Sequence, residues 1–320
     1  TRRSRVQVPL PAPLKNVKNQ NLTTKLFQFY IQNKDIREFK KDIFYYFFYR
    51  LLRNFFNEPI KIKIHNFYLF SNNNKNKASY SLLQKCDFFD IAEINLIKKV
   101  SNSREIFLID CGCNFGFYSL YVSSLSKKNR VISIEASHET IKEFNENLIL
   151  NNFDDVKSIN KAVSDTDHQI VELKESNKDW ESSIISSDYK VKNMVKIETV
   201  SVDTILKSEK IDGRCLILKI DVEGSDINVL AGAINTIKNH SPLIIIEFSK
   251  YISSNKKFNY EYLKFFLKEY SYLIYNSEGQ IVNLNSILKE LEELDKEHKT
   301  IGNYYLIKEN FYLIKDLFNK

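Results

Sequence analysis

Asp110 and Glu135 are the first candidates for a ligand-binding site in this sequence. Asp110 ends an apolar run, and a turn that contains Gly112 and Gly116 follows it directly. Glu135 ends the next strand-like run, 25 residues after Asp110. In α/β proteins a strand, turn and helix of this kind bring backbone N–H groups against a nucleotide-like ligand, and an acid at this distance binds the ribose. We therefore predict a nucleotide-type ligand at the glycine turn, with Glu135 on its ribose.

The spacing of the glycines excludes one common ligand. A dinucleotide fingerprint needs three glycines in the order G-x-G-x-x-G. After Gly112 this chain has Asn114 and Phe117 at the second and third positions, so the fingerprint fails twice. The order from Asp110 to Gly116, D-x-G-x-N-x-G, instead resembles the first motif of class I S-adenosylmethionine-dependent methyltransferases. The alternative is a turn without a ligand, because glycine turns are common in loops.

A second cluster of ionisable residues follows another apolar run. Lys219, Asp221 and Glu223 occur at a spacing of two, which on an extended strand places all three side chains on one face. Because charges that share a face are costly unless they pair, we expect Lys219 to compensate one carboxylate. Asp221 and Glu223 are candidates for a general base, since one carboxylate crowded by another has a raised pKa. The alternative is a salt-bridged cluster that only ends the strand.

A metal site is the rival interpretation of the same acids. Asp221, Glu223 and Glu247 are all expected near strand ends, and their carboxylates are the type of ligand that Mg²⁺ binds. Lys219 already places a cation on the face that Asp221 and Glu223 share. We therefore expect no metal.

The composition fits one large α/β domain with an accessory segment. The chain has 320 residues, 43% of them hydrophobic, and four cysteines. Cys111 and Cys113 bracket Gly112 without the spacing of a zinc site, so we expect all four thiols to be reduced and metal-free, which favours a cytoplasmic location. The net charge of +7 comes from lysines spread over the whole chain, and no nucleic-acid-binding signature accompanies them. We expect a solvated lysine-rich surface and no nucleic-acid partner.

Strand-like and helix-like segments alternate through the second two-thirds of the chain. Strands are expected at 106–110, 130–135, 156–160, 214–221, 242–248, 271–276 and 303–308. Helices are expected at 117–127, 138–151, 226–239 and 258–269. Two β-like runs, 169–174 and 195–201, are expected to form a hairpin or an edge extension. This alternation predicts a parallel sheet covered by helices on both faces, with its ligand at the carboxyl ends of the strands.

Further motifs accompany these two clusters in a fixed order. They are N-L-I-L-N-N (147–152), A-V-S-D (162–165), V-S-V-D-T-I-L (200–206), K-I-D-V-E-G-S-D (219–226), V-L-A-G-A (229–233) and P-L-I-I-I-E (242–247). Together with D-C-G-C-N-F-G (110–116), the set resembles the FkbM family of S-adenosylmethionine-dependent methyltransferases over roughly residues 85–250. One departure is the sequence Glu135-Ala136-Ser137, where the family usually has Glu-Pro.

The resemblance implies a fold, a cofactor and a reaction. The fold is a class I methyltransferase: α/β, Rossmann-like, with a mostly parallel seven-stranded sheet, helices on both faces and, here, a helical N-terminal segment. The cofactor is S-adenosylmethionine, and its implied ligands are Asp110, Gly112, Asn114 and Gly116 at the methionine end, Glu135 at the ribose and Ala162 at the adenine ring. The reaction is methyl transfer to a hydroxyl oxygen on a sugar, a glycan or a secondary metabolite. By their position at a strand end, Asp221, Glu223 and Lys219 are our candidates for the catalytic residues.

The chain divides into three parts in this interpretation. Residues 1–13 are basic and contain proline, and we expect an unstructured leader. Residues 14–77 form a helical, aromatic accessory segment, with the helical pattern over 14–57. Residues 78–320, beginning with a helix over 78–100, form the methyltransferase domain. The aromatic and basic segment 36–56 could rest on a membrane surface, but we expect it to be buried against the domain instead. No apolar run has the length of a membrane-spanning helix.

The expected partner is a small-molecule or glycan acceptor. Its identity and the oligomeric state stay open, because the N-terminal segment and the loops that build acceptor pockets carry the least resemblance. The alternative function is a non-catalytic binding or scaffold protein that retains a methyltransferase fold. The acids at the strand ends favour the enzyme.

Overall fold

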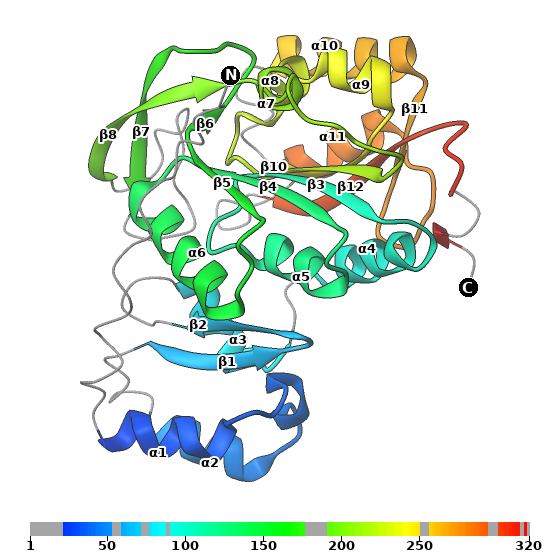
Figure 1. Ribbon diagram of the computed structural model, residues 1–320. Coiled ribbons are helices and arrows are strands. Elements are labelled where there is room, and N and C mark those ends of the chain that lie inside the picture. Colours follow the sequence, from blue (N-terminus) through cyan, green and yellow to red (C-terminus); the bar gives the residue numbers. More distant parts are fainter. Residues whose placement is uncertain are drawn as a thin grey trace.

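The computed structural model describes residues 22–52, 59–71, 77–87, 90–176, 191–249, 256–293, 300–313 and 317–318. Within these ranges a seven-stranded sheet carries helices on both faces, and a smaller N-terminal layer packs beside one of the helical layers (Figure 1). The leader predicted at residues 1–13 lies outside the described residues. The division at residue 78 falls at the start of a helix and stays a prediction.

The central sheet is mostly parallel, as predicted. Its strands, in spatial order, are β5 (Lys157–Asn160), β4 (Arg130–Glu135), β3 (Ile106–Cys111), β9 (Cys215–Ile220), β10 (Leu243–Ser249), β12 (Thr300–Lys308) and β11 (Tyr272–Tyr275). Neighbours from β5 to β10 pair in parallel, and β12 pairs antiparallel with both β10 and β11. The strand order therefore reverses between β3 and β9, which is where sheets of this kind bind ligands.

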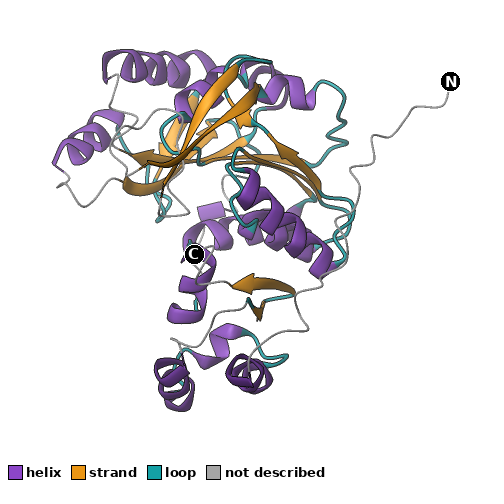
Figure 2. Ribbon diagram, turned by 90° about the vertical axis from the view of Figure 1, so that its left-hand side faces the viewer, coloured by secondary structure: helices purple, strands orange, loops and turns teal. Residues whose placement is uncertain are grey.

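Both faces of the sheet are apolar, so both must be covered. Successive side chains of a strand point to opposite faces: Ile106 and Leu108 of β3 join one buried cluster, and Phe107 and Ile109 join the other. The helices on the first face are α4 (Ile91–Ser103), α5 (Phe117–Leu125) and α6 (His138–Asn151). Those on the second face are α7 (Val202–Leu206), α8 (Asp226–Ala231), α9 (Ile234–His240), α10 (Lys256–Tyr270) and α11 (Leu284–Glu293). Figure 2 shows the two helical layers on either side of the strands.

A compact layer of N-terminal residues extends the first face. Its elements are α1 (Leu22–Ile31), the 3₁₀ helix η2 (Ile36–Phe39), α2 (Ile43–Leu52), the hairpin of β1 (Ile60–Ile64) and β2 (Phe67–Ser71), and α3 (Lys77–Lys85). The hairpin lies next to α5 and α6, while α1 and α2 lie beyond it at the end of the molecule (Figures 1 and 2). The helices α1, η2 and α2 pack together through aromatic side chains: the ring of Tyr45 contacts the rings of Phe27 and Phe39.

Two asparagines of α6 attach this layer to the domain. The side chain of Asn151 accepts a hydrogen bond from the N–H of Tyr68 at 2.6 Å and donates to its carbonyl at 2.5 Å. Asn147 accepts from the N–H of Phe70 at 2.8 Å and donates to the carbonyl of Phe115 at 3.1 Å. The exposed edge of β2 is thereby paired by amide side chains, which satisfies backbone groups that an edge strand leaves open.

A second, smaller sheet borders the domain. It contains β6 (Ala162–Val163), β8 (Val191–Val200) and β7 (Ile170–Ser176), in the order β6-β8-β7. β7 and β8 pair antiparallel, and β6 and β8 pair in parallel. The predicted pair of β-like runs is thus a hairpin, with a third short strand beside it.

Three long helices expected from the sequence are broken in the structure, each for a local reason. The helical pattern of residues 14–57 is interrupted after α1, where Asn33 has a φ of 65° and Asp35 caps η2. The helix over 78–100 ends at α3, because Cys86 takes a left-handed conformation, and restarts as α4. The helix over 226–239 is α8 and α9, since the Asp203 carboxylate binds the first N–H groups of α9. The helices α7 and α11 were not predicted.

All four cysteines are buried free thiols. Burial raises the pKa of the Cys111 and Cys113 thiols well above its usual range. Among the described helices, none combines the length and apolar character needed to cross a membrane.

Candidate active site

A cavity of about 290 Å³ lies at the carboxyl ends of β3, β4 and β9, where the strand order reverses. Its wall includes six of the predicted cofactor and acceptor residues: Gly112, Asn114, Glu135, Ala162, Asp221 and Glu223. The other residues of the wall are Asp90, Ile134, Ala136, Thr140, Lys161, Val163, Leu173, Val222, Ser225, Glu247 and Asn303. The two motifs that the sequence placed about 110 residues apart therefore meet in one cavity.

Glu135 is held at this cavity by backbone N–H groups. One carboxylate oxygen accepts from Asn114 at 3.0 Å and the other from Ser137 at 2.8 Å. Burial raises the pKa of Glu135 to about 7, although these hydrogen bonds oppose the shift by stabilising the carboxylate. A carboxylate fixed in this way at the end of the second strand can still accept hydrogen bonds from ligand hydroxyls in the cavity.

Gly112 joins the first motif to the second. Its φ is +79°, and a Cβ built at this position would lie 1.8 Å from the carbonyl oxygen of Asp221. The N–H groups of Gly112 and Cys113 both donate to the carbonyl of Ile134, at 2.9 and 3.0 Å. The glycine is therefore required by the packing of the two strand ends, and not only by a ligand.

Asp110 and Gly116 lie behind the cavity wall rather than in it. Asp110 is 1% exposed and accepts a hydrogen bond of 2.5 Å from the Ser119 hydroxyl. Burial raises its pKa to about 6. Gly116 has a φ of +92° at the start of α5, and a Cβ there would lie 2.0 Å from the ring of Phe144. These two residues shape the turn, and their contact with the cofactor stays a prediction.

Lys219 pairs with Asp221, as expected from their spacing. The Lys219 side chain is 1% exposed, and its Nζ donates to Asp221 at 3.1 Å and to the side-chain oxygen of Asn303 at 3.2 Å. It also lies over the ring of Tyr118, 5.3 Å from the centroid. The pKa of Lys219 is raised: burial opposes its charge, but the nearby Asp221, Asp90 and Glu247 outweigh burial. Lys219 thus fixes the Asp221 carboxylate from beneath the cavity.

Glu223 reaches the cavity by a turn, which differs from the predicted strand face. β9 ends at Ile220, and Glu223 has a φ of 53°. The buried Asp226 carboxylate accepts from the N–H groups of Val222 and Gly224, at 3.2 and 3.1 Å, and so holds the turn. Burial raises the pKa of Asp226 to about 6. The turn also leaves the Ser225 hydroxyl buried in the cavity wall with no hydrogen-bond partner among the described residues.

Several wall residues were missed from the sequence. Asp90 precedes α4, accepts from the Tyr118 hydroxyl at 2.6 Å and faces the same cavity. Asn303 comes from β12, opposite Glu247 in the β10–β12 register, so the antiparallel strand contributes to the site. No motif marks Asp90 or Asn303, because each reaches the cavity only through the packing of an element distant in sequence.

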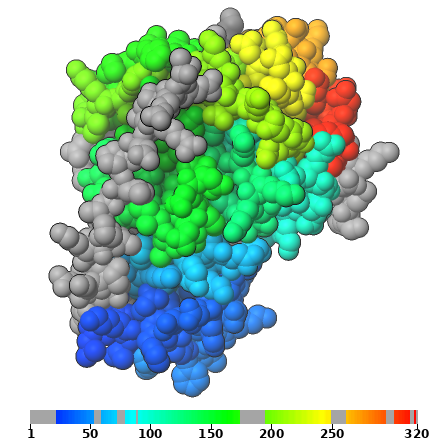
Figure 3. Space-filling view, viewed as in Figure 1, coloured from blue at the N-terminus to red at the C-terminus, as the bar shows by residue number. Residues whose placement is uncertain are grey.

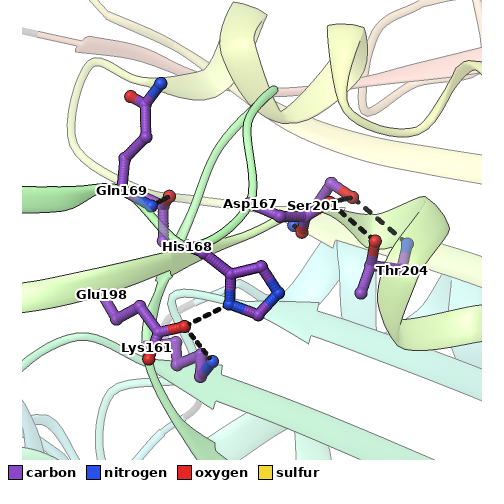
Figure 4. A network of polar contacts seen from close by, with 8 residues as sticks. Lys161, Asp167, His168, Gln169, Glu198, Ser201 and Thr204 are labelled. Carbon is purple, nitrogen blue, oxygen red and sulfur yellow. Dashed lines mark hydrogen bonds and ion pairs between the residues drawn. The ribbon is translucent and has the colours of Figure 1, made fainter.

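Lys161 is the basic residue of the wall, and the small sheet positions it. Its Nζ donates to Glu198 of β8 at 2.9 Å, and the same carboxylate oxygen contacts His168 Nδ1 at 2.6 Å. Figure 4 shows Lys161 and His168 both pointing toward Glu198, beside a separate set of bonds in which Asp167 accepts from Ser201 and Thr204. These bonds tie the loop after β6 to the hairpin, one strand of which supplies Leu173 to the cavity.

The apolar part of the wall consists of Ile134, Ala136, Ala162, Val163, Leu173 and Val222. Ala162 thus lines the cavity, and its place at the adenine ring stays a prediction. Within the described ranges, no group of three or more histidine, cysteine, aspartate or glutamate side chains is arranged to hold a metal ion.

The sheet order, with an antiparallel strand inserted between β10 and β11, and a cavity at the ends of β3, β4 and β9 define a class I methyltransferase fold. The Methyltransferase FkbM domain matches residues 110–274, just over half of the chain. The chain therefore belongs to the FkbM family of S-adenosylmethionine-dependent methyltransferases, which confirms the predicted resemblance.

Solved structures similar to this chain are also methyltransferases. The methyltransferase FkbM from Methylobacillus flagellatus KT is 16% identical, with a TM-score of 0.39, and the match covers 72% of this chain and 54% of that one. TYW2 from M. jannaschii, solved in complex with AdoMet, is 11% identical, with a TM-score of 0.36 and coverage of 78% and 86%. This chain thus matches about half the length of the M. flagellatus protein. Among curated proteins, none matches it significantly.

Proposed function

We propose that this protein transfers a methyl group from S-adenosylmethionine to a hydroxyl oxygen of a sugar, a glycan or a secondary metabolite. One observation carries the proposal: Glu135, which suits a ribose, and Asp221 and Glu223, which suit an acceptor hydroxyl, line the same cavity on the two sides of Gly112. A binding group and a proton acceptor that share one cavity can act on two ligands held together.

The residues present fit S-adenosylmethionine. Glu135 would accept from the ribose hydroxyls, and the apolar wall at Ala162 and Leu173 would pack on the adenine ring. The left-handed turn at Gly112 and Asn114 would border the methionine end. The unpaired Ser225 hydroxyl offers one further polar contact to a ligand in the cavity.

The acids would act on the acceptor. When bound, the cofactor supplies an electrophilic methyl group. Asp221 or Glu223 would accept the hydrogen bond of the acceptor hydroxyl and take its proton as the oxygen becomes methylated. Lys219 would act as a positioning residue, because its bond to Asp221 fixes that carboxylate toward the cavity. Lys161 and Asn303 would contact the acceptor or the cofactor from the rim.

Cofactor binding tests the first half of the proposal. We expect Glu135→Ala to weaken S-adenosylmethionine binding by about 1–3 kcal/mol, because hydrogen bonds to a charged group are lost. The measurement is isothermal titration calorimetry on the folded variant. Glu139→Ala, an exposed acid in the first turn of α6, is the matched control and should bind like the parent. An unchanged dissociation constant for Glu135→Ala would remove the ribose assignment.

Methyl transfer tests the second half. Asp221→Asn and Glu223→Gln preserve shape and remove charge, so cofactor binding should largely survive while transfer falls by roughly 10²–10⁴-fold for the residue that acts as base. The assay follows radiolabelled methyl groups into a panel of sugars, glycans and hydroxylated metabolites, and base-stable products identify ethers. Asp154→Asn, at an exposed site, is the control. Parent rates in both acid variants would leave the cluster a structural role, and cofactor binding without any transfer would favour a non-catalytic binding protein.

A further inference from the structure

The outermost helices, α1 and α2, present apolar side chains to solvent at helical spacing. On α1 these are Leu22, Leu26 and Phe29, and on α2 they are Ile43, Phe44, Phe47, Phe48 and Leu51. Ile43 is 82% exposed, Phe29 77% and Phe44 73%. Residues separated by three, four and seven positions lie on one side of a helix, so each helix carries a continuous apolar stripe. We call these eight residues the outer stripe.

The outer stripe is not needed for the packing of the N-terminal layer. The opposite sides of the same helices are already buried: Phe27 and Ile31 on α1, and Tyr45 and Tyr49 on α2. Tyr45 also donates its hydroxyl to the carbonyl of Leu83 at 2.6 Å. Helices that are apolar on every side are ordinarily buried on every side. The inner side of α2 is thus buried within the N-terminal layer and its outer side is exposed. The predicted burial of segment 36–56 against the domain stays a prediction.

The charged residues within α1 and α2 are positive, and one acid, Asp42, directly precedes α2. Neither α1 nor α2 contains an aspartate or glutamate. Lys25 lies three residues after Leu22 and four before Phe29, and Arg50 lies three residues after Phe47, so both cations border the stripe. Lys41, just before α2, is also exposed. Apolar and aromatic residues bordered by lysine and arginine characterise helices that lie in the interface of an anionic bilayer.

We propose that α1 and α2 bind the surface of a bilayer that contains anionic lipids, with the outer stripe among the acyl chains and Lys25 and Arg50 at the headgroups. Figure 3 shows the blue N-terminal residues at the lower end of the molecule, with the bulk of the domain above them, so this end can contact a flat surface. A second copy of the chain fits less well, because a symmetric contact would bring the bordering cations of the two copies together.

Vesicle flotation of the full chain tests this proposal. We expect the protein to float with vesicles of phosphatidylcholine and phosphatidylglycerol and much less with phosphatidylcholine alone. Only the vesicles with phosphatidylglycerol carry the negative charge that attracts Lys25 and Arg50. Phe44→Ser with Phe47→Ser should lower the bound fraction by at least about tenfold, since two buried phenylalanines are lost. Lys25→Glu with Arg50→Glu should lower it by about fivefold for each cation removed. Phe265→Ser, which changes an exposed phenylalanine of α10, is the matched control and should float like the parent.

Two results would overturn the proposal. One is absence of flotation on the anionic vesicles in the parent protein. The other is flotation that the Phe44 and Phe47 changes leave at the parent level. A parent protein that fails to float but is dimeric by light scattering, and becomes monomeric with the same two changes, would assign the outer stripe to a second copy instead. Because the site at Gly112 lies in a different layer, calorimetry with S-adenosylmethionine on the same variants shows that they are folded.

Discussion

Gly112 contacts the carbonyl of Asp221 so closely that a side chain has no room. The contact joins the end of β3 to the end of β9, and it sets the distance between the proposed cofactor side and the proposed acceptor side of the cavity. A substitution at Gly112 therefore disturbs the packing of these strand ends, whether or not a ligand is bound. The sequence suggested that Gly112 allows a ligand to approach the backbone closely. In the structure its close contact is with the backbone of Asp221.

We expect Gly112→Ala to lower the free energy of unfolding far more than Gly213→Ala. Both glycines have a positive φ, at +79° and +75°, so both variants bear the cost of about 1–2 kcal/mol for a left-handed alanine. A Cβ at Gly112 meets the Asp221 carbonyl, whereas at Gly213 nothing lies within 4 Å. Urea denaturation of the two variants measures the difference. Equal losses would show that the contact between the strand ends is relaxed in solution.

Helix α6 connects the N-terminal layer to the candidate active site. Asn147 holds the edge of β2 on one side and the carbonyl of Phe115, in the glycine turn, on the other. The amide is 1% exposed, so its hydrogen bonds have no competition from water. Asn147 therefore connects the N-terminal layer directly to the turn that precedes α5, while Asn151 holds the same layer through Tyr68.

We expect Asn147→Ala to destabilise the protein by about 1–3 kcal/mol, because buried backbone groups of Phe70 and Phe115 lose their partner. The N-terminal layer should also become more sensitive to limited proteolysis. Asn145→Ala, a half-buried asparagine of the same helix, is the control and should change little. Parent-like melting and proteolysis in Asn147→Ala would mean that the hairpin is held by its apolar contacts alone.

At the scale of the whole molecule, burial among the described residues keeps Asp110, Asp226 and Glu135 protonated at unusually high pH. Burial raises the pKa of Asp110 and Asp226 to about 6 and that of Glu135 to about 7. At these three groups the folded protein consequently binds more protons than the unfolded chain between about pH 4 and pH 7. Their contribution to the free energy of unfolding must then fall as the pH rises through this window, since stability falls wherever the folded state holds the extra protons.

We expect the ligand-free protein to lose on the order of a few kcal/mol of stability between pH 5 and pH 7.5 through these groups. Denaturant titrations at the two pH values measure the change. Asp110→Asn cannot titrate and retains an acceptor for Ser119, so its stability should depend less steeply on pH. A slope in this variant equal to that of the parent would show that Asp110 titrates normally in the folded protein.

The local chemistry of the strand ends could be predicted from the sequence. Apolar runs that end on Asp110, Glu135 and Lys219-Ile220-Asp221 specify buried parallel strands, because only strands covered on both faces lack alternation. The carboxyl ends of parallel strands lie at one edge of a sheet, so the meeting of these motifs followed from their order. The sequence alone was therefore enough to predict the family, the mostly parallel sheet and the hairpin of β7 and β8.

Only the tertiary structure decided which of these residues face the cavity. Asp110 and Gly116 turn inward and Glu223 reaches the wall by a left-handed turn, because the contacts of Ser119, Phe144 and Asp226 fix them. Asp90 and Asn303 come from elements distant in sequence, and α1 and α2 keep an outer apolar side. The sequence states the type of each side chain, but packing between separate elements determines whether it meets a ligand, another side chain or solvent.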